Sequence, residues 1–544
     1  MCTHAFLSIM KKNETFIASG EGYTHDGAGV VHHDGFVFFV PYLIEGEKAE
    51  IVITAIKKSY GYGRIVQLLE SSFHRINPKC SVYRKCGGCQ LMHMDYETQK
   101  AFKEDKVRNC FYMNAKMDID VLPIITTNHI EYYRNKVQVP IRWNGNDVER
   151  GFYQKHSNTI IQYDTCYVQS ELSNQIIDSI TKWLKDYHCV KEIRHILLKH
   201  AHFTNEVMVC LITRHHMFEG LDKLIKKILT SYPEVKSIVL VENRREDNVI
   251  LDGNEYLLYG NAYIEEELLG SRFRISAKSF FQVNPYATKK LYQTALDYAE
   301  IDETKTVIDL YCGTGTIGIL ASKHAKKVYG IEIVKEAIQD AKKNAELNNV
   351  TNIEFMVKDA GAGANELLKR KVQPDIVIVD PPRKGCSPDT LLAIQKMNPE
   401  KVVYISCDPA TLARDCKILK EYGYEINLVQ PVDLFPNSIH VETVVLLSKG
   451  EISTKNIRVE FPLDKMDMSG FQQGATYEEI KKYVFEQHGL KVSSLFIAQI
   501  KRKCGLEMGE NYNLPKDENA RVPQCTPEKE AAIMDALRHF HMIG

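Results

Sequence analysis

A glycine-rich turn between a buried strand and a helix constrains the fold more than any other feature of this sequence. The segment TVIDLYCGTGTIGILASK (306–323) has an apolar run that ends at Asp309 and Leu310, followed by a G-x-G-x-x-G pattern that begins at Gly313. A second strand ends at Glu332. Glycines let the backbone approach a nucleotide-like ligand closely, and a carboxylate at the end of the next strand can bind both ribose hydroxyls. The turn predicts NAD or S-adenosylmethionine as a cofactor, although the pattern also occurs in plain strand-to-helix turns.

The residues around this turn alternate between strands and helices. Further apolar runs are IEFMVKD, DIVIVD, KVVYIS and VETVVLLS, and polar helical stretches separate them. Strands that alternate with helices form a parallel sheet with helices on both faces. We therefore expect a Rossmann-like, doubly wound α/β domain over residues 273–450.

The rest of the chain is long enough for further domains, because 544 residues correspond to about three or four domains. Residues 10–72 have short alternating runs near 28–32, 35–41, 48–57 and 63–69, separated by Gly, Asp and Pro. This rhythm predicts a small antiparallel β-barrel of the oligonucleotide-binding kind, or a structural β module without a ligand. Residues 73–272 mix strands and helices and predict a central α/β region.

Residues 451–544 turn polar and predict a small helical C-terminal extension. The stretches TYEEIKKYVFEQHG, LKVSSLFIAQIKRKCG and TPEKEAAIMDALRHF indicate three short helices, which resemble a helix-turn-helix module. Lys501, Arg502 and Lys503 close the second helix. They are either a solvated charge run that complements the helix dipole or a contact to a nucleic-acid partner.

The overall charge does not favour any partner. A net charge of -1 and a pI near 7.0 give no general attraction to phosphate or to a membrane, so a nucleic-acid partner needs local basic patches such as KKSYGYGR (57–64). No run approaches the roughly 18 apolar residues of a membrane-spanning helix, and MCTHAFLSIMKKN is too short for a signal-peptide core. We expect a cytoplasmic monomer without a membrane partner.

The next strand end distinguishes between the two cofactors. Asp380 follows a buried strand and is itself followed by Pro381 and Pro382, which hold a rigid loop. Ligands of open α/β sheets bind over the carboxyl ends of such strands. This loop resembles the substrate-side loop of methyltransferases that act on planar nitrogen or base targets, which favours S-adenosylmethionine over NAD.

A thiol and a carboxylate are expected at the same sheet edge. Cys407 ends the strand KVVYIS and precedes a helix, where amides of the helix N-terminus can lower the pKa of a thiol. A thiolate beside a methyl donor suits uracil, whose C5 becomes nucleophilic once sulfur adds to C6. Glu442 begins the last strand and is a candidate base with a raised pKa. The plain alternatives are a buried inert cysteine and a solvated strand end.

Five motifs of this sequence together resemble those of the RNA uracil-5-methyltransferases, and they occur in the order and spacing of that family. They are FRISAKSFFQVNP, DLYCGTGTIG, DPPRKG, SCDPATLARD and HVETVVLL. The barrel and the cysteines resemble the iron–sulfur, TRAM-bearing branch of that family, which acts on 23S ribosomal RNA. The resemblance implies that Cys407 is the nucleophile and Glu442 the proton acceptor. It also implies contacts to S-adenosylmethionine from Gln282, Tyr311, Gly313, Glu332 and Asp380, and from Asp359 to the adenine.

Three of the 14 cysteines crowd together at Cys80, Cys86 and Cys89. In a reducing compartment such a group binds metal more often than it forms disulfides. Zinc usually requires paired C-x2-C knuckles, whereas three close cysteines with one distant thiolate suit a [4Fe–4S] cluster. By the family resemblance Cys166 is the fourth ligand. Four protein thiolates leave no open coordination position, so we expect a structural role.

Three other functions remain open at this point. One is an RNA-binding ribosome assembly factor with a vestigial methyltransferase domain, which the presence of both Cys407 and Glu442 argues against. The second is a tRNA uracil-5-methyltransferase, and the third an NAD-linked oxidoreductase, which leaves DPPRKG and SCDPAT unexplained. The sequence does not specify the uridine or whether one or two sites are modified.

Overall fold

The computed structural model describes residues 10–449, apart from 146, 156, 188, 189 and 248, and residues 477–504, 525–540 and 542. The chain forms two compact units, residues 1–453 and 454–544, and each is described by itself. None of the described helices is long and apolar enough to cross a membrane.

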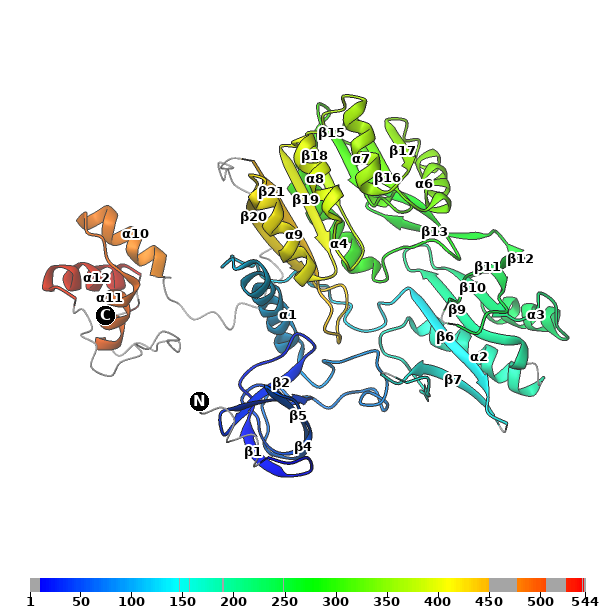
Figure 1. Ribbon diagram of the computed structural model, residues 1–544, viewed down its shortest axis with the longest axis horizontal. Helices are drawn as coiled ribbons and strands as arrows, with labels where there is room; N and C mark the ends of the chain where they lie inside the picture. Colours follow the sequence, from blue (N-terminus) through cyan, green and yellow to red (C-terminus); the bar gives the residue numbers. More distant parts are fainter. Residues whose placement is uncertain are drawn as a thin grey trace. The chain divides into compact units, whose positions relative to one another are not determined.

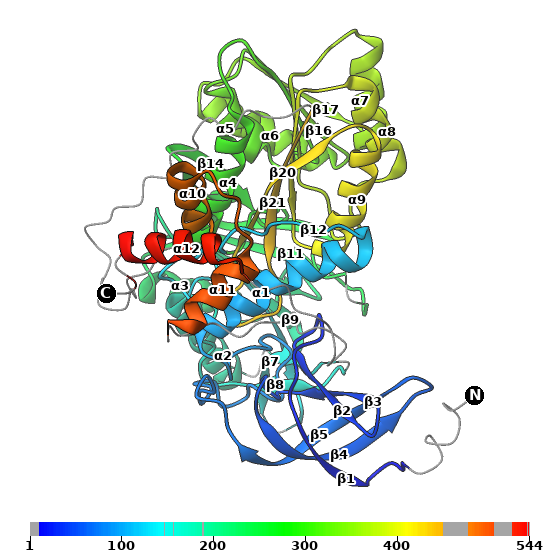
Figure 2. The same cartoon turned by 90° about the vertical axis from the view of Figure 1, so that its left-hand side faces the viewer.

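The N-terminal part of the first unit is a five-stranded sheet with the order β1-β4-β5-β3-β2 (Figure 2). All neighbouring strands are antiparallel except β3 and β5, which are parallel. Gly61 and Gly63 in β5 lie against the core, where an added Cβ would come within 2.4 Å of Phe38 and of Ile51. The YGYG pattern therefore serves packing of the sheet onto its core. The strands are β1 (Thr15–Ser19), β2 (Ala28–His33), β3 (Phe36–Pro41), β4 (Lys48–Ile56) and β5 (Tyr60–Glu70).

A long helix follows the cysteine-rich loop. Helix α1 (Tyr96–Cys110) begins at Asp95, whose side chain accepts a hydrogen bond from Thr98 N, and continues into a π-helical turn, Phe111–Ala115. Capping of this kind satisfies one of the free amides of a helix N-terminus. The buried Lys103 on α1 reaches Asp433, which follows β20 (Glu425–Val432). Helix α1 is therefore fixed to the sheet that carries the candidate site.

The central sheet has seven strands in the order β12-β11-β10-β9-β6-β7-β8 (Figure 1). Alternate side chains of its middle strands enter two different cores. Leu198 and Val209 pack with helices α2 and α3 on one face, and Leu197 and Cys210 pack on the other face with the hairpin formed by β13 and β14. Such alternation is the signature of a sheet covered on both faces. The elements are β6 (Lys136–Trp143), β7 (Val148–Tyr153), β8 (Ile160–Gln162), α2 (Glu171–Asp186), η3 (Val190–Glu192), β9 (Ile193–Ala201), β10 (Glu206–Thr213), α3 (Leu221–Ser231), β11 (Val235–Glu242), β12 (Asn254–Gly260), β13 (Tyr263–Leu268) and β14 (Ser271–Ser276).

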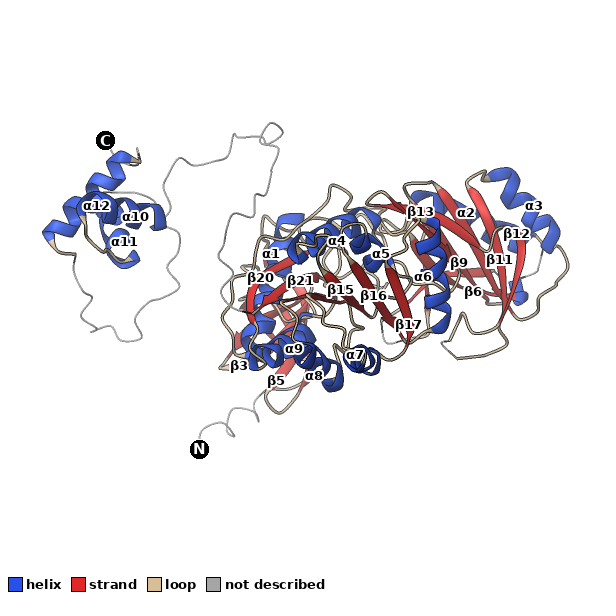
Figure 3. Ribbon diagram, turned by 90° about the horizontal axis from the view of Figure 1, so that it is seen from above, coloured by secondary structure: helices blue, strands red, loops and turns tan. Residues whose placement is uncertain are grey.

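The third sheet also has seven strands, in the order β17-β16-β15-β18-β19-β21-β20. Helices α4, α5 and α6 lie on one face and α7, α8 and α9 on the other (Figure 3). This confirms the α/β class with a Rossmann-like sheet covered by helices on both faces. The elements are α4 (Pro285–Ala299), β15 (Thr306–Leu310), α5 (Thr316–Ser322), β16 (Lys327–Glu332), α6 (Lys335–Leu347), β17 (Ile353–Val357), α7 (Ala360–Lys369), β18 (Ile376–Val379), α8 (Pro388–Met397), β19 (Lys401–Ser406), α9 (Pro409–Glu421), β20 and β21 (Glu442–Ser448).

The expectation of a wholly parallel sheet is wrong at one end. The first five strands are parallel, but β21 runs antiparallel to both β19 and β20. The connection from β20 to β21 is too short for a parallel crossover, which needs a dozen or so residues and usually a helix. As a result the beginning of β21 lies at the same edge as the carboxyl ends of β15, β18 and β19.

The second unit contains three described helices, α10 (Tyr477–His488), α11 (Ser494–Lys503) and α12 (Pro527–His539). Ile480, Ile497 and Ile533 are fully buried in a shared core. The predicted Lys501–Lys503 charge run is not a continuous exposed patch: Lys501 is buried, and the Lys503 ammonium forms an ion pair with Glu530. The side chain of Arg502 lies outside the described residues.

Candidate active site

Three predicted site residues meet at one edge of the third sheet. Asp380 follows β18, Cys407 follows β19, and Glu442 begins β21. Ser406 pairs directly with Thr443 across the antiparallel strands β19 and β21. Cys407 follows Ser406 and Glu442 precedes Thr443, so both lie at the same end of this strand pair. The negative charges of Glu442 and Asp380 both act on the Cys407 thiol. The sheet topology thus assembles a thiol and two carboxyl groups.

Cys407 faces a cavity of about 980 Å³ that is lined by three parts of the first unit. Tyr23 and Thr24 come from the β-sheet domain, Lys106 from α1, and Arg383 and His440 from the third sheet. Burial together with Glu442 raises the pKa of the Cys407 thiol to about 11, and the Arg383 charge opposes this rise.

The expectation that helix amides lower the pKa of Cys407 is wrong. Helix α9 begins after Asp408, whose own carboxylate accepts hydrogen bonds from Ala410 N at 2.9 Å and Thr411 N at 3.4 Å. The first amides of the helix therefore have a partner within the chain. The thiol must be deprotonated by other means, and Arg383 is the cation placed to stabilise the thiolate.

Glu442 is only 3% exposed. Burial raises its pKa to about 8, the charge of Asp380 adds to the rise, and Arg383 opposes it. Burial also raises the pKa of Asp380 to about 7. The raised pKa of Glu442 agrees with the expectation for a base in a partly dry pocket, because a group that titrates near neutral pH can accept and release a proton.

The glycine turn and the second carboxylate are joined by hydrogen bonds. Gly313 has a φ of +54° and its N–H donates to Glu332 at 3.2 Å, while Val334 N donates to the other Glu332 oxygen at 2.9 Å. At Gly315 an added Cβ would lie 3.0 Å from both Ala341 and Phe355. The turn therefore needs glycine for its conformation and for its packing on α6 and β17.

Tyr311, Gln282 and Asp359 are three further residues that the sequence predicts as cofactor contacts. Tyr311 has a φ of +65° and its hydroxyl lies 3.3 Å from Thr390 Oγ1. Gln282, 7% exposed, lies between β14 and α4 and its side chain hydrogen-bonds Tyr292. Asp359 is exposed and caps α7, accepting from Gly361 N at 3.0 Å.

Four residues of the site were missed by sequence reasoning: Arg383, His440, Lys106 and Tyr292. Arg383 directly follows Asp380-Pro381-Pro382, so its place in the motif was a usable signal. Lys106 lies on α1, far away in sequence, and its Nζ donates to the Ile439 carbonyl at 2.8 Å. Periodicity along one chain segment cannot reveal such a contact between distant segments.

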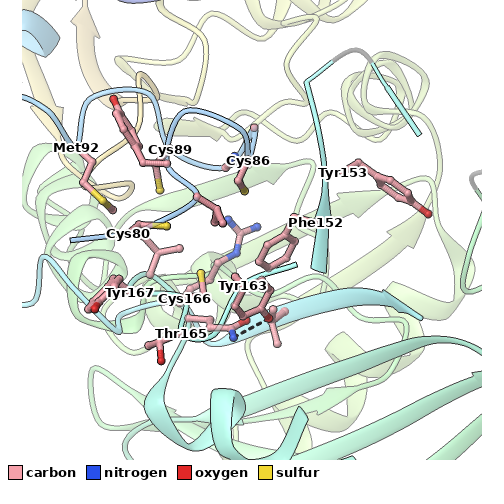
Figure 4. A pocket seen from close by; sticks show the side chains of 18 of the residues that line it. Cys80, Cys86, Cys89, Met92, Phe152, Tyr153, Tyr163, Thr165, Cys166 and Tyr167 are labelled. Atoms are coloured by element: carbon pink, nitrogen blue, oxygen red, sulfur yellow. Dashed lines mark hydrogen bonds between the residues drawn. The ribbon is translucent and has the colours of Figure 1, made fainter. Parts of the chain in front are cut away.

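The four predicted metal-ligating cysteines line a second cavity, with a volume of about 480 Å³. Figure 4 shows the sulfur atoms of Cys80, Cys86, Cys89 and Cys166 directed toward one space. Burial raises the pKa of Cys89, and the neighbouring thiols of the other three cysteines raise it further. Across the part of the chain that the structure describes, no group of three or more His, Cys, Asp or Glu side chains is arranged to hold a metal ion.

Comparisons with known proteins agree with this geometry. The family model described as tRNA (Uracil-5-)-methyltransferase matches residues 95–450. A protein of Oceanobacillus iheyensis named an uncharacterized RNA methyltransferase is 41% identical over 449 residues, covering 81% of this chain and 97% of its own length. A protein of the same description from Clostridium acetobutylicum is 41% identical over 451 residues, with coverages of 81% and 98%.

One solved structure is similar over most of both chains. It is described as the tRNA (uracil-54, C5)-methyltransferase of Pyrococcus abyssi in complex with S-adenosyl-L-homocysteine. The sequence identity is 28% and the TM-score 0.62, and the match covers 79% of this chain and 99% of the other.

Proposed function

Because this chain belongs to the tRNA (uracil-5-)-methyltransferase family, we propose that it methylates C5 of one or two uridines in 23S ribosomal RNA through a covalent bond from Cys407 to C6. The chain is an RNA (uracil-5-)-methyltransferase that uses S-adenosylmethionine. The observation that carries the proposed chemistry is the convergence of Cys407 and Glu442 at one sheet edge, beside a cavity of about 980 Å³.

The proposed reaction assigns one role to each group at this edge. The Cys407 thiolate, stabilised by Arg383, adds to C6 and makes C5 nucleophilic. C5 then takes the methyl group that S-adenosylmethionine supplies. Glu442 accepts the C5 proton, the electron pair of the C–H bond restores the C5–C6 double bond, and Cys407 leaves as a thiolate.

The methyl donor is proposed to lie over the glycine turn. Glu332, which accepts a hydrogen bond from Gly313 N, would bind the ribose hydroxyls. Gln282, Tyr311, Gly313 and Asp380 would make the other contacts to the donor, and Asp359 would face the adenine. The target base must leave any stack or duplex to reach Cys407, which agrees with a cavity open to both α1 and the β-sheet domain.

The substrate has two candidates. The cysteines and the TRAM-like domain resemble the branch that acts on ribosomal RNA, and this supports 23S ribosomal RNA. The Pyrococcus abyssi enzyme is described as acting on tRNA and matches 79% of this chain. That match extends beyond the catalytic domain, so the presence of N-terminal domains does not by itself argue against tRNA.

We propose a structural [4Fe–4S] cluster on Cys80, Cys86, Cys89 and Cys166. The support is a shared cavity of about 480 Å³, which suits a group larger than one ion, and a set of four thiols from two separate loops. Arg134 and Lys136 also line the cavity and would offset the negative charge of four thiolates. The cluster would join the loop before α1 to the loop after β8.

A mechanism-based inhibitor tests the covalent chemistry. We expect 5-fluorouridine RNA and S-adenosylmethionine to trap the wild-type protein as a denaturant-resistant adduct, because fluorine at C5 cannot leave as a proton. Cys407→Ala should bind S-adenosylmethionine normally and form neither adduct nor product. Cys416→Ala, which removes a buried thiol from α9, is the matched control and should still form the adduct. Product formation by Cys407→Ala would refute the proposal.

A methyl-transfer assay with both RNAs distinguishes the two candidate substrates. Unmodified 23S ribosomal RNA and unmodified tRNA are offered at equal concentration with labelled methyl donor, and 5-methyluridine is located in each. We expect label in the ribosomal RNA. Label confined to tRNA would replace that assignment and leave the catalytic proposal intact.

Elemental analysis tests the cluster. Protein purified without oxygen should be brown and carry about four irons per chain. Cys89→Ser should bleach it, whereas Cys110→Ser, on α1 outside the thiol cavity, should not. Zinc in place of iron in anaerobic protein would contradict this assignment.

A further inference from the structure

The loop that leads into Glu442 is held by the cysteine-rich segment. This loop, residues 433–441, connects β20 to β21 and carries His440 of the active-site cavity. The Asn437 carbonyl accepts two hydrogen bonds, one from Gln90 N and one from Leu91 N, each at 3.0 Å. Gln90 directly follows Cys89, so the last cysteine of the group is one residue away from this contact.

Helix α1 holds the same residue from a second side. Asn437 N donates to Gln99 Oε1 at 2.9 Å, and Gln99 Nε2 donates to Asn437 Oδ1 at 3.3 Å and to the Met94 carbonyl at 3.0 Å. Asn437 Nδ2 donates to the Ile130 carbonyl at 3.2 Å. The backbone carbonyl, the backbone N–H and both side-chain polar atoms of Asn437 are therefore bound by residues far away in sequence.

Asn437 is also conformationally suited to this place. Its φ is +68°, which asparagine and glycine tolerate better than other residues, and the residue is 9% exposed. A buried residue with this many partners has one defined position. Glu442 follows five residues later and begins β21.

A second set of contacts joins the cysteine cavity to the loop that carries Gln282, a proposed contact of the methyl donor. Arg134 lines the thiol cavity, and its N–H donates to the Val168 carbonyl, two residues after Cys166, at 2.8 Å. The next residue, Asn135, donates from Nδ2 to the Gln282 carbonyl at 2.9 Å and from its backbone N–H to the Val283 carbonyl at 2.8 Å.

We infer that Asn437 and Asn135 are positioning residues, through which the two cysteine-bearing loops set the places of Glu442 and Gln282. Asn437 fixes the proton acceptor relative to Cys407, and Asn135 fixes the loop that approaches the methyl donor. This inference rests on the proposed function, because it presupposes that Glu442 removes the C5 proton. It predicts that changes in the cysteine-bearing loops alter catalysis although the four cysteines line a different cavity from Cys407.

The two residues should give different kinetic signatures. Asn437→Gly keeps the positive φ and all backbone bonds but removes both side-chain bonds. We expect kcat to fall by about tenfold to a hundredfold, since a small displacement of a catalytic group has effects of this size. Because proton removal becomes the slow step, adduct with ordinary uridine RNA should accumulate, while the KM for S-adenosylmethionine stays unchanged.

Asn135→Ala is the matched comparison. It removes one side-chain bond from the cofactor side and should raise the KM for S-adenosylmethionine without accumulation of adduct. Gln99→Met removes the acceptor of the Asn437 backbone N–H and the donor to Asn437 Oδ1, and leaves the bond from Asn437 Nδ2 to Ile130. It should also lower kcat and accumulate adduct. Thermal unfolding and iron content are measured for each variant, so that the kinetics refer to folded protein.

Two results would overturn the inference. One is an Asn437→Gly protein whose kcat falls only in proportion to its folded fraction, with no accumulated adduct. The other is an unchanged kcat in both Asn437→Gly and Gln99→Met. Formation of the 5-fluorouridine adduct by the wild-type protein is the check on the proposed function itself, so a failure there is distinguishable from a failure of the positioning role.

Discussion

Three carboxylic acids lie at the catalytic edge of the third sheet: Asp309 and Glu442 are buried, and Asp380 is half-buried. Burial raises the pKa of Asp309 to about 8, of Asp380 to about 7 and of Glu442 to about 8. The Asp309 carboxylate accepts a hydrogen bond from Gly318 N at 2.8 Å and so fixes the start of α5 against β15. Because all three groups titrate near neutral pH, each is protonated for part of the time there, and the edge holds less negative charge than three ordinary carboxylates would give it.

The raised pKa of Glu442 has a consequence for stability. Below pH 4.5, its ordinary pKa, the carboxyl is protonated in both the folded and the unfolded state. Between pH 4.5 and about 8 the folded state keeps a proton that the unfolded state releases, so the free energy of unfolding falls as pH rises. Above about pH 8 the loss is complete.

Glu442→Gln removes this titration and keeps the shape of the protonated side chain. At each pH, the free energy of unfolding of the wild type is subtracted from that of the variant. We expect this difference to be about 2–4 kcal/mol larger at pH 9 than at pH 5. Urea unfolding of both proteins at the two pH values measures the difference. Glu421→Gln, at an exposed position of α9, should leave the difference unchanged. Equal gains at pH 5 and pH 9 for Glu442→Gln would contradict the assigned cause.

Residues at strand ends were predictable because the topology of an α/β sheet determines where such ends meet. Asp380 and Cys407 follow apolar runs directly, and their edge position was inferred from that alone. The raised pKa of Cys407 was not predictable, because it comes first from burial and then from the charge of Glu442, and a single strand end does not reveal either. Lys106 was not predictable as a cavity residue, because it comes from a helix outside the catalytic sheet.

The elements with strong apolar runs were predicted well. The runs at 306–310, 376–379 and 401–406 are strands β15, β18 and β19. Strand β20 was not predicted, because EINLVQPV contains polar residues and a proline, as is common near a sheet edge. Strand β1, TFIAS, was missed for a similar reason: it is short and alternately exposed.

An ion pair fixes α1 to the loop after β20. The Lys103 ammonium lies 2.6 Å from Asp433 Oδ1, both side chains are fully buried, and Lys103 also donates to the Phe435 carbonyl. Tyr96, at the start of α1, donates to the other Asp433 oxygen at 3.0 Å. Burial lowers the pKa of Lys103, and the charge of Asp433 opposes this.

Removal of one partner should therefore be costly. We expect Lys103→Met to lower the free energy of unfolding by about 3–5 kcal/mol, because it leaves the Asp433 carboxylate buried without its cation. Arg108→Met on the same helix breaks an exposed pair with Asp105 and should cost no more than about 1 kcal/mol. Urea unfolding measures both. Similar losses for the two variants would show that the buried pair does not anchor α1.

At the scale of the whole molecule, the catalytic cavity depends on segments that are distant in sequence. Its lining includes Thr24 from the β-sheet domain, Asn109 from α1 and Pro409 from the third sheet. Residues 1–453 accordingly form one compact unit, although composition suggests three regions there. The substrate surface is thus built between these regions, which a region-by-region reading of the sequence could not show.

The second unit, residues 454–544, has its own core, and its described lysines bear on whether it contacts RNA. Two described lysines there are paired with acids, Lys482 with Glu486 and Lys503 with Glu530, and Lys501 is buried. Phosphate binding releases counterions in proportion to the number of cations that contact the backbone, so paired and buried lysines contribute little. These three described lysines therefore favour a minor part for α10 and α11 in RNA binding.

A chain that ends at Lys449 tests this role. We expect it to bind S-adenosylmethionine and to methylate the same RNA as the full chain. The slope of log RNA affinity against log salt concentration should differ from that of the full chain by less than about one. The positive control is the full chain with both Lys57→Gln and Lys58→Gln. These lysines lie exposed in the β4–β5 turn, and their removal should reduce the slope by about two. If the shortened chain instead loses a slope of two or more while its cofactor affinity is unchanged, the C-terminal unit contacts RNA through residues other than the buried or paired lysines.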